Sequence, residues 1–169
     1  VIAYMPYPGE NGGISLVDPD GKIVGVQEVK DDAPARALAF KVINDQFGTL
    51  TFVRVYSGII KKGDTMYNVT RDKKERIGRM VEVQANATKD IDEVRAGDIC
   101  AFVSMKDTET GDTLSDPSSP ILLERMRFPD PVISVSVEPK TRADIDKMST
   151  AIYKMVKADP SLRLEVDHE

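Results

Sequence analysis

Gly58-Ile59-Ile60-Lys61-Lys62-Gly63-Asp64-Thr65 has the glycine spacing of a phosphate-binding P-loop, but its central residue is wrong for one. A P-loop needs a lysine directly after its second glycine and a helix whose first amides receive the phosphate. Asp64 occupies the lysine position, and residues 65 to 70 are strand formers without helical apolar spacing. The stretch therefore predicts a strand, a turn and a second strand.

Further strand-like runs lie on both sides of this stretch. Leu38, Phe40 and Val42 alternate with their neighbours, and a second run follows after a turn near residues 45 to 48, which predicts a hairpin. The short runs that predict strands are 37–43, 50–56, 65–70, 75–83, 99–105 and 121–127. Because a closed barrel removes the exposed edges of many short strands, we expect a mainly β chain folded as an antiparallel β-barrel.

Glycine–aspartate pairs recur at strand entrances, as Gly63-Asp64, Gly97-Asp98 and Gly111-Asp112. The glycine can adopt positive φ and the aspartate can accept hydrogen bonds from nearby backbone amides, so the pairs predict turns. An alternative is that Asp64 and Asp98 act as the acid and base of a small hydrolase. Recurring turns explain the same residues without chemistry.

The sequence pattern changes after Phe128-Pro129-Asp130-Pro131. Residues 132–137 alternate like a strand, and Thr141 is expected to cap a helix with an acid three residues later. The apolar face of that helix, which we expect to be core, consists of Ile145, Met148, Ile152, Met155 and Val156. After Asp159-Pro160 a second strand is expected over 162–166, which gives a β-α-β unit.

Basic residues are concentrated in one part of an acidic chain. The 169 residues carry a net charge of -5, whereas residues 50 to 80 hold eight basic side chains and three acidic ones. We expect phosphate contacts from Arg71, Lys73, Lys74, Arg76 and Arg79, and less strongly from Arg54, Lys61 and Lys62. No clustered aromatic platform is expected beside them. The alternative is a solvated hairpin whose lysines protect an edge strand.

Several kinds of site and location are poorly supported by composition. Cys100 lies in an apolar run and is expected to be a buried strand thiol, and His168 lies at an end expected to fray, so we expect no catalytic residue or metal site. No apolar run approaches the roughly 20 residues of a membrane span, and no signal peptide is evident, so we expect a cytoplasmic, monomeric chain. Since Val1 is not an initiator methionine, we expect a piece of a longer protein.

Motifs in a fixed order resemble the second domain of the translational GTPases, and within them the bacterial elongation factor G family. The matching runs are Phe52-Val53-Arg54-Val55-Tyr56-Ser57-Gly58-Ile59-Ile60-Lys61-Lys62-Gly63-Asp64, Lys74-Glu75-Arg76-Ile77 and Val94-Arg95-Ala96-Gly97-Asp98-Ile99. Thr110-Gly111-Asp112-Thr113-Leu114 resembles the end of that domain, residues 131–141 resemble the start of the third domain, and Tyr4-Met5-Pro6-Tyr7-Pro8 resembles the exit from the GTP-binding domain.

The resemblance implies a linker over 1–35, a translation-factor domain II barrel over 36–128, and the β-α-β start of a ferredoxin-like third domain over 129–169. It implies a parent GTPase that drives ribosomal translocation of tRNA and mRNA, with GTP and magnesium in its absent GTP-binding domain and no cofactor in this chain. The implied partners are small-subunit ribosomal RNA and the parent's other domains. Paralogous recycling, release and ribosome-protection factors, and a barrel with protein partners only, remain alternatives.

Overall fold

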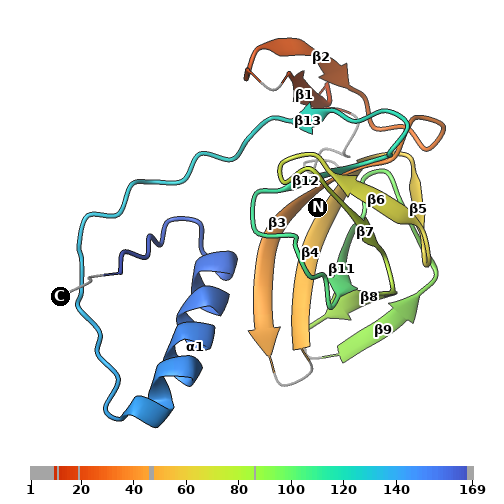
Figure 1. The fold of residues 1–169 in the computed structure, drawn as a ribbon. Coiled ribbons are helices and arrows are strands. Elements are labelled where there is room, and N and C mark those ends of the chain that lie inside the picture. The colour runs from red at the N-terminus through yellow and green to blue at the C-terminus, as the bar shows by residue number, and fades with distance from the viewer. Residues whose placement is uncertain (1–9, 11, 19, 46–47, 86, 167–169) are drawn as a thin grey trace.

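The computed structural model describes residues 10, 12–18, 20–45, 48–85 and 87–166. Strands dominate, and one α-helix follows them near the C-terminus (Figure 1). The first strands are β1 (Ile14–Val17), β2 (Ile23–Gln27), β3 (Arg36–Asp45), β4 (Gly48–Ser57), β5 (Ile59–Lys61), β6 (Thr65–Asn68) and β7 (Lys73–Arg76). They are followed by β8 (Arg79–Gln84), β9 (Ala87–Ile91), β10 (Glu93–Arg95), β11 (Ile99–Val103), β12 (Thr113–Ser115), β13 (Leu122–Leu123), the 3-10 turn η1 (Arg142–Asp144) and α1 (Ile145–Ala158).

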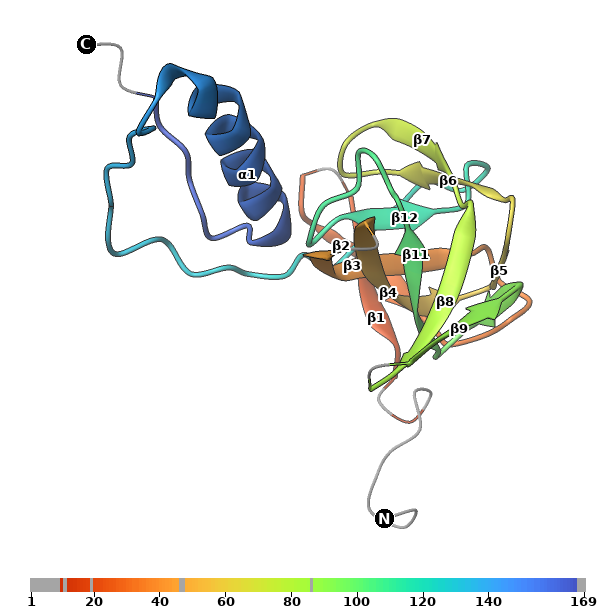
Figure 2. The same cartoon turned by 90° about the horizontal axis from the view of Figure 1, so that it is seen from below.

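The main sheet has eight antiparallel strands in the order β7-β6-β12-β3-β4-β11-β8-β9 and curls into a barrel (Figure 2). A short β5–β10 ladder accompanies it, and β13, β1 and β2 form a third small sheet. The predicted fold class, an antiparallel barrel, is confirmed. Within the stretch that the resemblance implies as a linker, β1 and β2 form a hairpin, and β1 also pairs with β13, which follows the barrel strands in sequence.

The β3–β4 hairpin supplies the centre of the barrel core. Val53 and Val55 on β4 are fully buried, while Phe52, Arg54 and Tyr56 alternate with them on the outer face. The core cluster also includes Ala37 and Ala39 from β3, Ile60, Met66, Ile77, Met80, Cys100, Phe102 and Leu114. Because these side chains come from most of the barrel strands, burial of one shared core fixes the strand order.

The strand predicted over 75–83 is wrong, because the chain turns in its middle. The Ile77 amide donates to the Asp64 carbonyl at 2.8 Å, and the Gly63 amide donates to the Ile77 carbonyl at 2.8 Å. These bonds hold the fully buried Ile77 against the β5–β6 turn. The residues before it consequently pair with β6, and those after Gly78 pair with β11. The strand predicted over 121–127 is likewise reduced to β13.

The two strands predicted at the ends of the β-α-β unit are absent from the described residues. Residues 132–137 and 162–166 have no ladder partner, and Val132 and Ile133 are 94% and 81% exposed. A strand needs a neighbouring backbone to satisfy its N–H and C=O groups. No described segment provides one here, so the alternating sequence alone does not produce a strand.

The helix forms as predicted, but its core assignment and its cap are wrong. No residue of α1 is buried: Ile145 and Met155 are 44% and 58% exposed, and Met148, Ile152 and Val156 are half-buried. The Thr141 hydroxyl donates to the Asp144 carboxylate at 2.6 Å and caps no backbone amide. Among the described residues, no helix is both long and apolar enough to cross a bilayer. The expectation for His168 falls outside the described residues.

Candidate nucleic-acid interface

The eight basic candidates lie on β4, β5, β7 and β8 and in the turns on either side of β6, and they differ in what their charged groups contact. Three are held in ion pairs, one lies over an aromatic ring, and four are exposed without an ion pair in the part of the chain that the structure describes. The ion-paired residues are Arg71, Lys73 and Arg79, and the residue over an aromatic ring is Arg54. The exposed residues without an ion pair are Lys61, Lys62, Lys74 and Arg76. The structure therefore separates residues that the sequence placed in one group.

Strand β7 presents Lys74 and Arg76 on its outer face. Successive side chains of a strand point to opposite sides, so Lys73 and Glu75 face the other way. The Arg76 Nε donates to the Gly63 carbonyl at 3.3 Å, which brings this guanidinium to the β5–β6 turn where Lys61 and Lys62 are exposed. We call Lys61, Lys62, Lys74 and Arg76 the free basic cluster.

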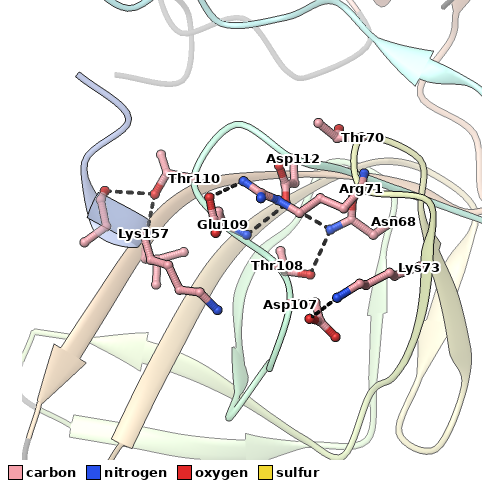
Figure 3. Close-up of polar contacts among 12 residues, drawn as sticks. Asn68, Thr70, Arg71, Lys73, Asp107, Thr108, Glu109, Thr110, Asp112 and Lys157 are labelled. Carbon is pink, nitrogen blue, oxygen red and sulfur yellow. Dashed lines mark hydrogen bonds and ion pairs between the residues drawn. The ribbon is translucent and has the colours of Figure 1, made fainter. Parts of the chain in front are cut away.

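Lys73 and Glu75, on the other face of β7, both contact the loop between β11 and β12. Lys73 Nζ contacts Asp107 Oδ1 at 2.6 Å, and this hydrogen bond raises the pKa of Lys73 and lowers the pKa of Asp107 (Figure 3). Glu75 is buried, and its carboxylate accepts from the Thr108 hydroxyl at 2.9 Å and from the Asp107 amide. Lys73 thus has a structural partner that a nucleic-acid phosphate would have to displace.

Arg71 belongs to a network around the buried Asp112. The Asp112 Oδ2 atom accepts from Arg71 Nε at 3.0 Å, from the Asn68 amide at 2.9 Å and from the Glu109 backbone amide at 2.9 Å (Figure 3). Arg71 also pairs with the Glu109 carboxylate. A buried carboxylate is stable only when donors surround it, so Arg71 stabilises this loop and is not a free phosphate ligand.

Arg54 lies in an aromatic environment that the sequence analysis did not expect. Its guanidinium carbon is 5.2 Å from the centre of the Tyr56 ring, and Phe40 lines the same groove, which has a volume of about 450 Å³. Phe40 and Phe52 also pack together with ring centres 6.3 Å apart. The expectation of no aromatic cluster beside the basic residues is therefore wrong for Arg54, because alternation along β4 places Tyr56 on the same face and β3 adds Phe40.

The hydrolase alternative requires Asp64 and Asp98 to act as acid and base. In the structure each of these carboxylates accepts a hydrogen bond within its own β-turn. Asp64 Oδ2 accepts from the Lys61 amide at 2.8 Å, and Asp98 Oδ2 accepts from the Arg95 amide at 3.1 Å. Gly63 and Gly97 both have φ of 96°, which matches the prediction of glycine-dependent turns. The two carboxylates close separate turns, which favours the structural explanation over an acid–base pair.

Comparison with known proteins gives matches over both parts of the chain. Residues 48–115 match the family model of elongation factor Tu domain 2, and residues 128–169 match that of elongation factor G domain III. The chain is an elongation factor G-like fragment. A translation-factor domain II barrel and the start of a domain III make up this fragment, as the resemblance implied.

A solved structure is similar to most of this elongation factor G-like fragment. It is a crystal structure of a protein from Thermus thermophilus, with a TM-score of 0.67 and 28% sequence identity over 79% of the chain. The fragment covers 20% of the length of that protein.

Proposed function

We propose that this chain is the ribosome-docking and interdomain coupling part of an elongation factor G, whose full protein promotes GTP-dependent translocation of tRNA and mRNA. The observation that supports docking is the free basic cluster on a chain of net charge -5. Exposed cations without carboxylate partners are available to neutralise phosphates, and release of counterions then favours binding. In this proposal GTP and magnesium belong to the parent's GTP-binding domain, and no cofactor is assigned to the described residues.

The partner in this proposal is small-subunit ribosomal RNA. Lys61, Lys62, Lys74 and Arg76 lie around one strand and one turn, so they can contact phosphates of a single backbone. Phosphate contacts position a protein without reading sequence, which suits docking on a large RNA surface. The coupling role is supported by the contacts of α1 of domain III with the barrel loop that carries Thr110.

The first prediction concerns the double variant Lys74→Glu/Arg76→Glu. Because two phosphate contacts are lost and two like charges are introduced, we expect binding of the chain to isolated small ribosomal subunits to weaken by at least roughly tenfold, with the salt slope lowered by about one per contact. Binding is measured by co-sedimentation between about 50 and 200 mM salt. Lys73 is left unchanged because its substitution would also break the pair with Asp107.

The control variant Lys89→Glu/Lys147→Glu makes the same charge change on β9 and α1, away from the cluster. It should bind close to the unchanged chain. If both double variants lose the same binding affinity, overall charge and not the cluster explains the effect. If Lys74→Glu/Arg76→Glu loses no affinity, the result favours a barrel that binds proteins only. Repeating the titration with protein-free small-subunit RNA tests whether RNA itself is the partner.

A further inference from the structure

A cleft lies between the end of the barrel and α1, apart from the free basic cluster. Its volume is about 480 Å³, within the range of small-molecule sites. Lys106 lines it from the barrel loop, and Tyr153, Lys154 and Lys157 line it from the helix. Figure 1 shows α1 lying beside β3, so the cleft is formed by parts of the chain that are far apart in sequence.

Within the described residues, the hydrogen bonds between the two walls of the cleft lie near the C-terminal end of α1. The Thr110 hydroxyl donates to the Ala158 carbonyl at 3.0 Å (Figure 3). Lys157 Nζ donates to the Lys106 carbonyl at 2.6 Å. The first bond satisfies a carbonyl that the end of α1 leaves without an intrahelical partner, and the second ties the helix to the barrel loop. Further along the helix, Ser149, Thr150 and Tyr153 line the cleft opposite Val42 and Met105 of the barrel.

Three lysine side chains line this cleft, and few carboxylates of the described residues lie near them. Lys106, Lys154 and Lys157 make no ion pair within the described residues, although all three line the space. The pKa of Asp107 is lowered chiefly by its hydrogen bond from Lys73, and the charges of Lys157 and Lys106 lower it further. The Asp107 carboxylate, which already pairs with Lys73, is thus close to the ammonium groups of Lys106 and Lys157. An added anion would relieve the repulsion among the lysines that line the cleft.

We propose that this cleft binds a small anion carrying two or more linked phosphates, held by Lys106, Lys154 and Lys157. Lysine ammonium groups bind phosphate as point charges, and three of them match an anion whose charges are close together. Ser149 and Thr150 add hydroxyl groups to the helix wall. The Tyr153 ring adds an apolar surface for a group attached to the phosphates, and Lys157 lies 5.7 Å from its centre.

Such a ligand would contact domain II and domain III at once. Its phosphates would bridge Lys106 on the barrel and the lysines of α1, adding ionic contacts to the few hydrogen bonds that now join them. The bound state would therefore favour the arrangement seen here over one in which α1 leaves the barrel. This inference does not depend on the proposed ribosome docking.

The test is calorimetric titration of the whole 169-residue chain with inorganic tripolyphosphate at low salt. We expect saturable binding that weakens roughly tenfold in Lys106→Gln/Lys154→Gln, which removes two of the three cations. The control Lys89→Gln/Lys147→Gln makes the same charge change outside the cleft and should bind within about twofold of the unchanged chain. Asp107→Asn should bind more tightly, because it removes the carboxylate that competes for the lysines.

Amide NMR shifts locate the anion, and a short uridine oligonucleotide tests RNA backbone as the source of the phosphates. Shifts confined to residues 106–108 and 149–157 on adding tripolyphosphate support the cleft. Binding that does not saturate, equal losses in both double variants, shifts centred on the free basic cluster, or binding of the oligonucleotide alone would each overturn the proposal. Far-ultraviolet circular dichroism of each variant verifies that the fold is retained.

Discussion

At the scale of single residues, three glycine–aspartate pairs close three turns in the same way. In each turn the aspartate amide donates to the carbonyl three residues earlier, and its carboxylate accepts from the amide of that earlier residue. The glycine between them has φ of 96° at Gly63, Gly97 and Gly111. The turns could be predicted from sequence because their chemistry is local. The greater role of Asp112 could not, because Asn68 and Arg71 reach it only in the folded barrel.

Replacing the turn aspartate by alanine should lower the free energy of unfolding by different amounts in different turns. Asp112→Ala should lower the free energy of unfolding by roughly 2 to 3 kcal/mol, since it removes the buried acceptor that the Asn68 amide, Arg71 Nε and the Glu109 amide share. Asp64→Ala, at an exposed turn, should cost about 1 kcal/mol or less. Urea denaturation followed by circular dichroism measures both, and equal losses would contradict the network described here.

At the scale of elements, alternation predicted strands well only where a neighbouring strand was present. The β3–β4 hairpin forms as expected because its two runs pair with each other. Residues 132–137 alternate as clearly but remain unpaired. Residues 75–83 have strand-like sequence throughout, yet Ile77 is held at a turn by backbone bonds to residues 63 and 64. A sequence period specifies which side chains share a face, but a ladder also needs a partner backbone.

The central position of β11, between β4 and β8, controls the chemistry of Cys100. The thiol is 2% exposed, as predicted for a strand thiol, and burial, with a smaller effect from the Asp98 carboxylate, raises its pKa to about 12. An unfolded cysteine titrates near 8.5, so the unfolded state loses its proton first as pH rises. The contribution to stability is complete below about pH 8.5 and is lost progressively toward pH 12.

Stability at high pH should therefore differ between the unchanged chain and Cys100→Ala. Between about pH 8.5 and 10, the unchanged chain should lose up to about 1.4 kcal/mol per pH unit more than the variant. Urea denaturation under reducing conditions measures the free energy of unfolding of both chains. In the difference between them, the titration of the groups that both chains share cancels. Parallel pH profiles for the two chains would contradict a buried, protonated thiol.

At the scale of the whole molecule, the loop between β11 and β12 connects the barrel to α1. Lys73 and Arg71 bind this loop from one side, through Asp107 and Asp112. On the other side, the Thr110 hydroxyl accepts from the Val42 amide at 3.1 Å and donates to the Ala158 carbonyl at 3.0 Å. Thr110 thus joins β3 of domain II to α1 of domain III. Sequence analysis did not identify it, because no local pattern marks a contact across 48 residues.

Replacing this hydroxyl should loosen the helix without unfolding the barrel. In Thr110→Val we expect the amides of α1 to exchange hydrogen roughly fivefold faster, as the loss of about 1 kcal/mol per hydrogen bond implies, while β4 and β11 stay protected. Thr150→Val is the matched control, since the Thr150 hydroxyl bonds only to the Asp146 carbonyl within α1. Hydrogen exchange read by mass spectrometry measures both, and equal acceleration in the two variants would contradict the role of Thr110.

The sequence by itself determined the antiparallel barrel class, the glycine–aspartate turns, the buried thiol and the amphipathic helix. Each depends on side-chain period or on bonds within a few residues, which are properties of a local segment. The tertiary structure alone decided which basic side chains are paired and which are exposed, the aromatic surroundings of Arg54, and the lysine-lined cleft. These depend on contacts between segments distant in sequence, and their positions are fixed only when the barrel core and the β11–β12 loop are in place.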